Sequence, residues 1–547
     1  MSGRRVEPIV GRLDSRVRVP GSKSLTNRAL VAACLADGVS VLRNVGLGDD
    51  TRAMISCLES LGADITVDGT SARVVGVGGR PHAPRGPLDA NQSGTTARFI
   101  LPLLVLAGSG TITGHPQMRA RPMAHLADAL RQLGARVDAD SLPISVEAST
   151  PLGRAVSIDS AVSSQFVSGL LLCAPALPQG LALTLTGEPV SSSYIRMTVS
   201  VMRAFGADLS WEDDVITVGP GGYEGVGYAV EPDASTATYP LAAAAIVGGR
   251  VIVDGLGSSS TQGDIGFADV LAQMGADVFV DDDRIEIRGS GSLRAVSVDL
   301  GEMSDTAPTF AVLGARAVGR SSATGIGFIR STKESDRVAA AVEELARLGI
   351  DAAVEDDGFS VQGGPHHHAE VHTYEDHRMA MALSLLGLVD TPVTVLDPSC
   401  VSKTFPGFFD MLDTMRAEAR TEPLVLAIDG PAGSGKSTVA RNVSERLRLP
   451  HLYTGAMYRS VTLAVLRSAV SIDNDDAVTR AAERAELSVS AHLVTIDGIE
   501  VTADLRSPEV TSAVSPVSAS PGVRRVLAER QREWARVRGA AVLEGRD

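Results

Sequence analysis

The sequence predicts an α/β fold in which one β/α unit is repeated several times and is followed by a module of a different pattern. A chain of 547 residues is too long for one hydrophobic core, so about three or four compact units are expected. Hydrophobic residues make up 44% of the chain and aromatic residues only 4%, a composition that suits helices packed on sheets of small side chains. A short phrase that recurs through much of the chain completes the prediction.

The repeated phrase predicts a helix, a tight turn and a strand in each unit. Apolar residues before each copy fall on one helical face, glycine fits the left-handed position that ends a helix, and a short β-like run follows. The spacing of roughly 70 residues exceeds that of common solenoids, so we expect β/α subdomains grouped into lobes. The copies are Leu61-Gly62-Ala63-Asp64, Leu133-Gly134-Ala135-Arg136, Phe205-Gly206-Ala207-Asp208, Met274-Gly275-Ala276-Asp277 and Leu348-Gly349-Ile350-Asp351.

The main boundary is expected near residue 421. A last helix is predicted over Phe408 to Met415, and the polar stretch Arg416 to Pro423 that follows it is typical of a linker. The apolar strand Leu424 to Ile428 then begins a pattern without the repeated phrase.

Charge and cysteine content restrict the partners and the compartment. A net charge of −15 argues against nucleic acid or an anionic membrane as a general partner, because both need a basic surface. Four widely spaced cysteines without a CxxC pair indicate neither a disulfide framework nor a zinc ribbon, and they fit a reducing cytosol. No secretory signal or membrane-spanning stretch is recognised, so we expect a soluble, cytoplasmic protein.

Basic residues recur at turns and helix starts in the first module. Lys23 and Ser24 stand at an expected loop-to-helix junction with Arg28 about one turn further on, which suits an anion because helix-start amides, a hydroxyl and cations combine there. Taken singly, each such segment could be an ordinary helix cap with exposed cations. Similar segments are Asn91 to Arg98, Arg119 to Met123, Ser163 to Gln165, Lys333 to Arg337, Asp376 to Arg378 and Lys403 to Pro406. Their recurrence in an acidic chain favours one shared site for ligands that carry phosphate and carboxylate groups.

Taken in order, these segments resemble the 5-enolpyruvylshikimate-3-phosphate synthase family over approximately residues 5 to 415. The motifs that carry the resemblance are GSKSLTNR, NQSGTTAR, RARPM, SSQF, PDAST, QGD, KESDR, DHRMAM and SKTFPGF. The resemblance implies two lobes of three β/α subdomains each, lobe one about 21–233 and lobe two about 1–20 plus 234–420, with the site between them. It implies transfer of the enolpyruvyl group of phosphoenolpyruvate to the 5-hydroxyl of shikimate 3-phosphate by addition and elimination, without metal or organic cofactor, in a first module that is monomeric.

The same resemblance implies the site residues. Those expected to hold shikimate 3-phosphate are Lys23, Ser24, Arg28, Ser163, Ser164, Gln165, Ser191, Asp305 and Lys333. Those expected around phosphoenolpyruvate are Lys23, Gly94, Arg121, Gln165, Arg337, Arg378 and Lys403. The catalytic set is Asp305 as proton acceptor for the 5-hydroxyl, with Glu334 and Lys23; a carboxylate and an ammonium are suitable acid/base groups. The segment Ile329 to Glu334 is one residue longer than the common family spacing.

Two alternatives remain for the first module. An enzyme acting on UDP-N-acetylglucosamine would share the fold and chemistry, but it normally carries a catalytic cysteine in the loop that matches His115 to Arg121, where none occurs. A non-catalytic phosphate-binding scaffold would keep the cations and lack an acid/base pair, which Asp305 and Glu334 argue against. The run His366-His367-His368 is expected to be a solvated loop and no metal site, because adjacent side chains point in different directions.

The second module begins with a phosphate-binding loop. Strand Leu424 to Ile428 leads into GPAGSGKST, which satisfies G-x-x-x-x-G-K-[ST] before a helix-like continuation. In such a loop backbone amides surround the phosphates, the lysine reaches the terminal phosphates and the Ser can coordinate magnesium. The residues expected to bind Mg-ATP are Gly430, Pro431, Ala432, Gly433, Ser434, Gly435, Lys436, Ser437 and Thr438, with Ser437 as the Mg²⁺ ligand.

Later segments of this module resemble the cytidylate kinase family. They are Leu452 to Arg459, Asp504 to Ser507, Ser515 to Arg524 and Gly545 to Asp547. The resemblance implies CMP contacts by Thr454, Arg459, Ser515, Arg524, Arg546 and Asp547. Shikimate kinase is the alternative P-loop enzyme, which these later segments disfavour. The resemblance stops roughly halfway through the family's length, so residues 421–547 are expected to form a truncated kinase domain whose activity is in doubt.

Overall fold

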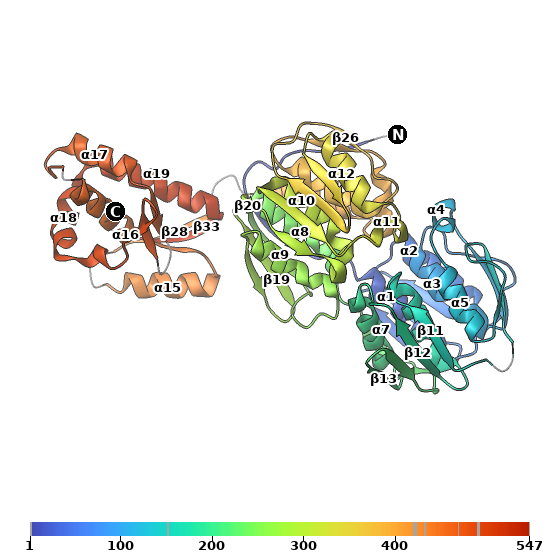
Figure 1. Cartoon of the computed structure of the whole chain (residues 1–547). Coiled ribbons are helices and arrows are strands. Elements are labelled where there is room, and N and C mark those ends of the chain that lie inside the picture. Colours follow the sequence, from blue (N-terminus) through green and yellow to red (C-terminus); the bar gives the residue numbers. More distant parts are fainter. Residues whose placement is uncertain are drawn as a thin grey trace.

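A computed structural model describes residues 3–149, 152–419, 424–430, 434–468, 470–489 and 493–545. Figure 1 shows two neighbouring lobes and, beyond the second of them, a smaller module that ends the chain. Each lobe has its own hydrophobic core. The core of the first lobe runs from Leu25 to Val230, and that of the second combines Val6 to Val19 with Ala234 to Met415.

In the described residues, five of the six larger sheets of the two lobes follow one plan, in which two parallel strands are extended by an antiparallel hairpin, and in the sixth sheet a single antiparallel strand takes the place of the hairpin. In the first lobe the sheets are β16 (Gly227–Ala229), β4 (Val39–Arg43), β6 (Ser71–Val75), β5 (Asp64–Asp68); β7 (Leu88–Asp89), β8 (Ser109–Thr113), β10 (Ile144–Glu147), β9 (Arg136–Val137); and β11 (Ala155–Asp159), β12 (Leu181–Thr186), β14 (Val215–Val218), β13 (Leu209–Glu212). In the second lobe they are β2 (Leu13–Val17), β17 (Gly249–Asp254), β19 (Arg284–Gly289), β18 (Asp277–Val280); β21 (Ser297–Asp299), β23 (Arg320–Thr324), β25 (Gly358–Gln362), β24 (Ala352–Glu355); and the shorter β26 (Glu370–Val371), β27 (Val393–Val395), β1 (Arg4–Val6). This repetition confirms the predicted fold class.

The helices of the two lobes pack on one face of these sheets and against one another. Those of the first lobe are α1 (Lys23–Leu35), α2 (Asp49–Ser60), α3 (Gly94–Leu106), α4 (Pro116–Arg119), α5 (Ala124–Gln132), α6 (Ser164–Cys173), η1 (Ala174–Ala176) and α7 (Ser192–Ala204). Those of the second are α8 (Ala234–Val247), η2 (Gly263–Gly266), α9 (Phe267–Gln273), η3 (Gly301–Thr306), α10 (Ala307–Arg316), α11 (Ile329–Thr332), α12 (Arg337–Arg347), α13 (His377–Ser384), η4 (Leu385–Leu388), η5 (Pro398–Lys403) and α14 (Phe408–Glu418). Two short pairs, β3 (Ala36–Asp37) with β15 (Tyr223–Glu224) and β20 (Leu293–Arg294) with β22 (Ala317–Val318), complete the lobes.

The repeated glycines end helices as predicted. They follow α2, α5, α7, α9 and α12, and each adopts a positive φ: Gly62 at 108°, Gly134 at 96°, Gly206 at 86°, Gly275 at 106° and Gly349 at 84°. Because a side chain is disfavoured there, the helix stops and the chain turns back into the hairpin strand.

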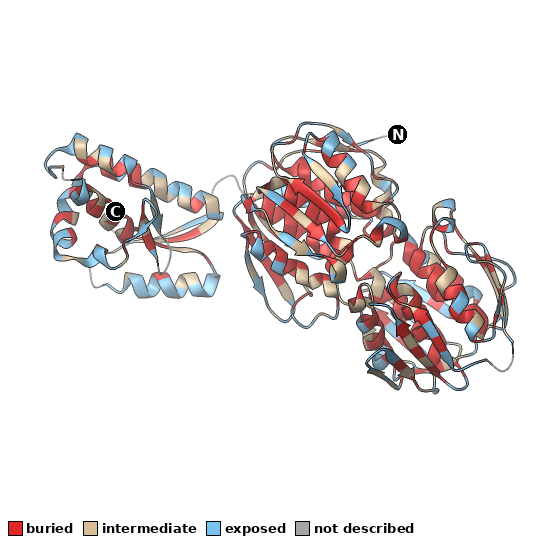
Figure 2. Cartoon of the chain, in the orientation of Figure 1, coloured by how far each residue is buried: buried red, intermediate tan, exposed pale blue. Residues whose placement is uncertain are grey.

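The helices at the centre of each lobe are apolar on nearly every side. Every residue of α3 except its last is buried, and α3 packs on α6, which is almost as buried. Figure 2 shows the equivalent position in the second lobe filled by α8 and α10, which are buried almost throughout. Helices without a polar face must be surrounded by protein along their length. The polar residues that reach the space between the lobes therefore stand in the N-terminal turns of these helices.

Two expectations need correction. The last helix of the second lobe extends to Glu418, beyond Met415, because Arg416 to Glu418 continue the helical backbone. The histidine run is only partly solvated: His367 and His368 are exposed, but His366 is buried and its Nε2 lies 2.9 Å from the carbonyl oxygen of Thr391. No group of metal-binding side chains is found among the described residues.

The third module is a three-stranded parallel sheet with helices on it. Its sheet has the order β28 (Leu424–Ile428), β33 (Ala540–Glu544), β29 (His451–Tyr453). Its helices are α15 (Lys436–Leu447), α16 (Thr454–Arg467), α17 (Asp475–Arg484), η6 (Asp504–Arg506), α18 (Pro508–Ala519) and α19 (Pro521–Arg538), and a small meander is formed by β30 (Leu487–Val489), β31 (Val494–Ile496) and β32 (Ile499–Glu500). In Figure 2, α15 is mostly exposed.

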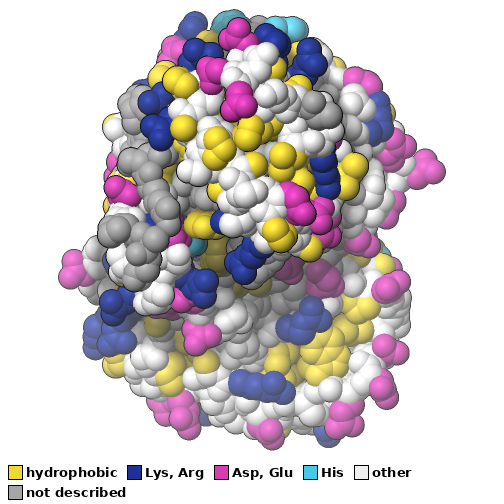
Figure 3. Space-filling model, turned by 90° about the vertical axis from the view of Figure 1, so that its left-hand side faces the viewer, with side chains coloured by type: hydrophobic (Ala, Val, Ile, Leu, Met, Phe, Trp, Pro, Cys, Tyr) yellow, Lys and Arg dark blue, Asp and Glu magenta, His cyan; other side chains and the backbone are white. Residues whose placement is uncertain are grey.

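Charges of both signs are mixed on the end of the molecule that this module forms. In Figure 3 acidic and basic side chains alternate there with hydrophobic ones, and no continuous basic field is visible on this face. The module touches the second lobe through an ion pair of 3.2 Å between Arg448 Nη1 and Asp281 Oδ2. Within the described ranges, no helix is both long and apolar enough to cross a membrane.

Candidate active site between the lobes

A polar cavity lies where the helix starts of the first lobe face η3 and α11 of the second. It measures about 50 Å³. Both lobes contribute to its wall, which is formed by Lys23, Ser24, Thr95, Arg98, Arg121, Val162, Ser163, Ser164, Gln165, Ser191, Tyr194, Asp305, Phe328, Thr332 and Lys333.

Side-chain caps set the helix starts that reach this cavity. Ser22 Oγ accepts the amide of Leu25 at the start of α1, Ser93 Oγ accepts that of Thr96 in α3, and Ser163 Oγ accepts that of Gln165 in α6. Such caps hold the loop before each helix in one conformation and leave neighbouring amides available. Three separate segments of the first lobe therefore present hydroxyl and amide groups to one place.

Asp305 is the centre of the charged cluster on the second lobe. Its carboxylate accepts from Lys333 Nζ at 2.7 Å, Arg337 Nη1 at 2.8 Å and Arg378 Nη2 at 2.9 Å. The hydroxyl of Tyr194, from the first lobe, donates to the same carboxylate at 3.2 Å. The predicted proton acceptor thus touches three of the predicted cations.

Glu334 is the second buried carboxylate. It pairs with Arg337 Nη2 at 2.7 Å and with Lys403 Nζ at 2.8 Å. Arg337 is fixed from behind by Asp376, whose Oδ2 accepts from Nε at 2.8 Å. Asp376 also caps α13 by accepting the amide of Arg378 at 3.0 Å, so one side chain orients two of the predicted cations.

Several contacts of this cluster cross between the lobes. Arg121 of the first lobe donates through Nε and Nη2 to the carbonyl of Thr332 at 3.1 and 2.8 Å. Lys403 of the second lobe donates to the carbonyl of Gln92 at 3.1 Å. Lys23 Nζ lies 2.9 Å from Asp50 Oδ2, and Lys403 Nζ lies 3.9 Å from Asp50 Oδ1. Cations from both halves therefore meet around shared acceptors.

Burial and neighbouring charge move the pKa values of the acid/base candidates. Burial alone would raise the pKa of Asp305, but Arg378, Lys333 and Arg337 together hold it well below its ordinary value. The pKa of Glu334 is likewise held low against burial, by Lys403, Arg337 and Arg121. Burial lowers the pKa of Lys333, and Asp305 only partly offsets this. Both carboxylates are therefore ionised in this arrangement.

The structure brings most of the predicted site residues together. Those that line the cavity are Lys23, Ser24, Arg121, Ser163, Ser164, Gln165, Ser191, Asp305 and Lys333. Arg337, Arg378 and Lys403 join them through the carboxylates just described, and Gly94 lies against the Arg121 guanidinium.

Arg28 is the predicted contact that points elsewhere. Its guanidinium is buried within the first lobe, where it donates to Thr198 Oγ1 at 2.7 Å, Ser168 Oγ at 3.1 Å and the carbonyl of Ser24 at 2.9 Å. The Phe99 ring lies 5.2 Å from its Cζ. In this arrangement Arg28 supports the loop that carries Ser24, and its direct contact with a substrate stays a prediction.

Sequence reasoning did not assign Arg98 to the site. Arg98 Nη1 donates to Gln165 Oε1 at 2.7 Å, and its Cζ lies 5.0 Å from the Phe166 ring centroid. Its Nε and Nη2 are buried without a hydrogen-bond partner among the described residues. Its position at the end of the NQSGTTAR segment was the available signal. Tyr194 and Asp50 were also missed, because nothing in their local sequence marks them.

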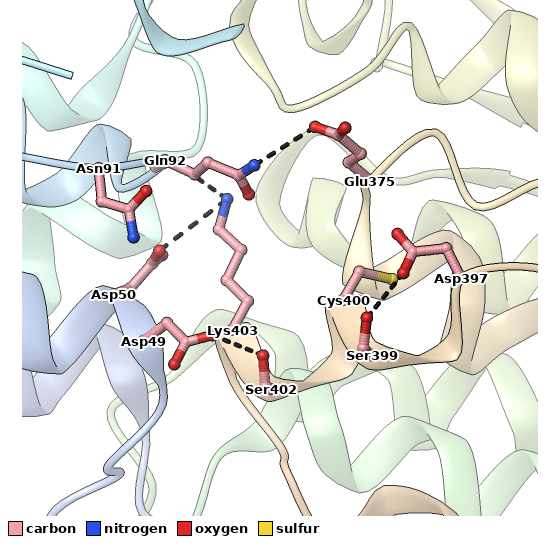
Figure 4. Close-up of a pocket in the computed structure, with 10 residues that line it drawn as sticks. All are labelled: Asp49, Asp50, Asn91, Gln92, Glu375, Asp397, Ser399, Cys400, Ser402 and Lys403. Carbon is pink, nitrogen blue, oxygen red and sulfur yellow. Dashed lines mark hydrogen bonds and ion pairs between the residues drawn. The ribbon is translucent and has the colours of Figure 1, made fainter. Parts of the chain in front are cut away.

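A second, wider pocket opens on the far side of Lys403. It measures about 290 Å³ and is acidic, with Asp49, Asp50, Glu375 and Asp397 in its wall. Figure 4 shows Lys403 reaching between Asp50 and Gln92 at its edge, with Ser402 bonded to Asp49 across the lobes. Its carboxylates would repel an anion. The pocket therefore lies at the edge of the cationic site and outside it.

The described phosphate-loop residues of the third module lie between the end of β28 and the first turn of α15. Gly430 and Gly435 have φ values of 153° and 84°, which let the loop bend and begin the helix at Lys436. Ser437 Oγ donates to Glu544 Oε1 at the end of the adjacent strand β33, and sequence reasoning missed this carboxylate. Ser434 and Thr438 lie in the same described segment, whereas Pro431, Ala432 and Gly433 lie outside the described residues.

The residues assigned to CMP that the structure describes are spread over three helices. Thr454 Oγ1 donates to the carbonyl of Glu544 at 2.8 Å. Arg459 Nη1 donates to Thr511 Oγ1 at the start of α18 at 3.2 Å. Ser515 and Arg524 are exposed further along, with Arg524 Nε bonded to the carbonyl of Ser518. Arg546 and Asp547 lie outside the part of the chain that the structure describes.

The geometry defines a two-lobed α/β protein with a cationic interlobe site, joined to a P-loop module. Residues 8–412 match the family model of EPSP synthase (3-phosphoshikimate 1-carboxyvinyltransferase), and residues 426–547 match that of cytidylate kinase. The chain therefore belongs to the EPSP synthase family and carries a cytidylate kinase domain in its C-terminal part. Both family resemblances predicted from the motifs are confirmed.

Individual relatives agree with this assignment. The 3-phosphoshikimate 1-carboxyvinyltransferase of Salmonella arizonae is 40% identical over 428 residues, which are 75% of this chain and 98% of that protein. The protein of the same name from Colwellia psychrerythraea is 40% identical over 416 residues, 74% of this chain and 97% of that protein. The solved EPSP synthase of Acinetobacter baumannii is 26% identical with a TM-score of 0.64, and the match covers 75% of this chain and 97% of that one.

Proposed function

We propose that residues 1–420 form a 3-phosphoshikimate 1-carboxyvinyltransferase, which transfers the enolpyruvyl group of phosphoenolpyruvate to the 5-hydroxyl of shikimate 3-phosphate and releases phosphate on the route to chorismate. The observation that carries this proposal is the convergence of cations from both lobes on a cavity lined by Asp305, with Glu334 joined to the same cluster through Arg337. A scaffold that only binds phosphate would not need buried carboxylates beside its cations, because they oppose anion binding.

The two substrates are assigned to two sets of side chains in and around the cavity. The hydroxyls of Ser163, Ser164 and Ser191 lie on the first-lobe side with Lys23 and suit the ring hydroxyls and phosphate of shikimate 3-phosphate. Guanidinium groups suit the phosphate and carboxylate of phosphoenolpyruvate, because they form paired, charge-assisted hydrogen bonds. Arg121 and the Arg98 donors face that part of the wall.

Proton transfer follows from the cluster around Asp305. In the addition step the 5-hydroxyl oxygen bonds to C2 of phosphoenolpyruvate while its proton goes to Asp305, and C3 gains a proton from the ammonium group of Lys23. In the elimination step C3 returns a proton to Lys23, the C2–C3 double bond forms again and the C2–O bond to phosphate breaks, and the phosphate leaves with the proton held by Asp305. Substrate carboxylate and phosphate would take over donors of Arg337 and Arg378, and this raises the pKa of Asp305 toward that of a useful base.

The cations also stabilise the leaving group. Negative charge moves onto the phosphate as the tetrahedral intermediate collapses, and fixed positive groups in a water-poor site favour that change. The reaction needs no metal or organic cofactor. The proposal includes a monomeric first module and a cytoplasmic location, which would keep the four free thiols reduced.

Phosphate release from the substrate pair tests this proposal. Asp305→Asn should lower kcat by about 10²- to 10⁴-fold, the usual contribution of a positioned acid/base group. Lys23→Ala should weaken the binding of both substrates. The exposed residues Asp68 and Arg73 provide matched controls, Asp68→Asn and Arg73→Ala, which should behave as the wild type. Turnover by Asp305→Asn at the wild-type rate would remove the assigned role, and an inactive wild type would remove the function.

The third module supports a second candidate function, the binding of ATP and its use to phosphorylate CMP. The observation that favours it is the contact between Ser437 at the start of α15 and Glu544 at the end of the neighbouring strand. A hydroxyl and a carboxylate are oxygen donors of the kind that Mg²⁺ prefers, so the residues present fit the ion. Ser437 and Glu544 would hold it, and Mg²⁺ would neutralise charge on the phosphates.

Calorimetric titration with Mg-ATP, followed by an assay for CDP from CMP, tests this second function. Lys436→Met should abolish ATP binding, whereas Arg441→Met, one turn along the same helix and exposed, should leave it unchanged. Equal ATP affinity of the wild type and Lys436→Met would refute the assignment of the loop, and binding without CDP formation would restrict the module to nucleotide binding.

A further inference from the structure

Glu302 of the second lobe holds the start of a helix that belongs to the first. It lies in η3, three residues before Asp305. Its Oε1 accepts from the Ser192 amide at 3.0 Å and from Ser192 Oγ at 2.9 Å, and its Oε2 accepts from the Ser193 amide at 2.7 Å. These are the first amides of α7, so the carboxylate caps a helix across the gap between the lobes.

Neighbouring contacts reinforce the cap. Arg196, one turn along α7, donates to Glu302 Oε2 at 3.0 Å. Ser193 Oγ donates to the Glu302 carbonyl at 2.8 Å, and Ser191 Oγ donates to the carbonyl of Gly301 at 3.1 Å. The residue before the helix, Ser191, has no side-chain cap of its own and adopts a left-handed backbone with φ 50°, so α7 depends on the other lobe for its cap.

The Glu302 side chain therefore couples the contact between the two lobes to the capping of α7. The first amides of a helix have no partner within the helix, and a negative charge there is favoured by the helix dipole. Burial opposes ionisation of Glu302, but Ser192, Ser193 and Arg196 lower its pKa, which keeps it charged. If the lobes separate, these donors lose their acceptor and must be hydrated instead.

The cap lies beside the substrate site and outside it. Ser191 and Asp305 line the cavity, whereas Glu302 and Ser192 do not. Two of the other interlobe contacts, Arg121 to Thr332 and Lys403 to Gln92, are made by side chains that are assigned to substrate binding. Glu302 can therefore govern the closed arrangement without taking a donor from the substrates.

We infer that Glu302 is a positioning residue that latches α7 of the first lobe to η3 of the second, and thereby sets Ser191 and Asp305 opposite each other for the reaction. The kinetic part of this inference rests on the proposed function, and the structural part does not. Every bond of the latch requires both lobes, so a closed protein keeps these bonds and an open one loses them.

Hydrogen exchange at the amides of Ser192 and Ser193 tests the latch directly. Glu302→Ala should raise their exchange rates at least about tenfold, because a hydrogen-bonded amide exchanges only when its local contact breaks. Glu302→Gln keeps an acceptor oxygen but loses the charge, so it should give an intermediate rate. Glu370, which is exposed on β26, provides the control Glu370→Ala, for which wild-type exchange is expected.

Kinetics on the same variants test the positioning role. Glu302→Ala should raise KM for shikimate 3-phosphate about tenfold, the effect of losing one net charge-assisted contact on closure, and Glu302→Gln should recover part of this loss. Exchange rates at Ser192 and Ser193 that match the wild type in Glu302→Ala would overturn the latch. Faster exchange with unchanged KM and kcat would overturn the positioning role. A wild type without turnover would reject the proposed function while the exchange result still decides the latch.

Discussion

A methyl group at Gly94 should weaken phosphoenolpyruvate binding by displacing Arg121. A Cβ built on Gly94 would lie 2.8 Å from Arg121 Nη1, 2.9 Å from its Cζ and 3.0 Å from its Nη2. The guanidinium cannot retreat freely, because its Nε and Nη2 are bonded to the carbonyl of Thr332. Gly94→Ala therefore forces Arg121 out of line with its ligand. Losing one charge-assisted hydrogen bond costs about 1.5–3 kcal/mol, which corresponds to a KM increase of about 10- to 150-fold.

The assay is steady-state phosphate release with phosphoenolpyruvate varied at saturating shikimate 3-phosphate. KM for phosphoenolpyruvate should rise and kcat should stay within about threefold, the pattern expected when binding is lost equally in the ground and transition states. Gly86→Ala is the matched control, because a Cβ at Gly86 would meet nothing within 4 Å. An unchanged KM for phosphoenolpyruvate, or an equal rise in KM for shikimate 3-phosphate, would refute the reasoning.

Three further predictions concern stability and reactivity. Burial, with the charge of Asp305, raises the pKa of Asp264 to about 7. The neutral carboxyl therefore stabilises the fold fully below about pH 4, and this contribution is lost as the pH rises through 7. Urea unfolding at a series of pH values should show the loss in the wild type but not in Asp264→Asn. Burial raises the pKa of Cys34 to about 12, so at pH 8 a thiol reagent should modify it at least about a hundredfold more slowly in the folded protein than in urea. Phe99→Ala removes a fully buried ring and should lower the free energy of unfolding by about 3–5 kcal/mol, whereas Phe279→Ala, which is 39% exposed, should cost less than about 1 kcal/mol.

The repeated fold was predictable because its signal is local. A glycine such as Gly62 or Gly275 ends a helix through its own backbone conformation, and the apolar face before it packs on the sheet that follows. Strand pairing between distant segments has no such signal. Nothing near Arg4 to Val6 indicates that β1 pairs with β27, and the β/α pattern alone does not indicate that β2 adds to β17. These pairings depend on how the chain closes on itself.

The candidate site was predictable in part for the same reason. Lys23 and Ser163 stand at helix starts that the sequence marks with hydroxyl-rich loops, and the structure places both in the cavity wall. The partners of the cations could not be predicted, because Asp50 and Asp376 reach them only through the fold. The direction of a long side chain could not be predicted either. Arg28 belongs to the same motif as Lys23, yet its side chain points into its own lobe.

The carboxylates between the lobes explain how an acidic protein keeps so many buried cations ready for anionic substrates. A buried guanidinium without a partner costs several kcal/mol, and Asp305 lowers that cost by pairing with Arg337 and Arg378 at 2.8 and 2.9 Å. In the proposed function, substrate oxygens would replace the Asp305 oxygens one by one, so the cations would remain paired throughout binding. Each exchange removes a positive neighbour from Asp305 and makes its carboxylate a better proton acceptor. In the proposed function, binding of the anions and activation of the base are thus the same electrostatic event.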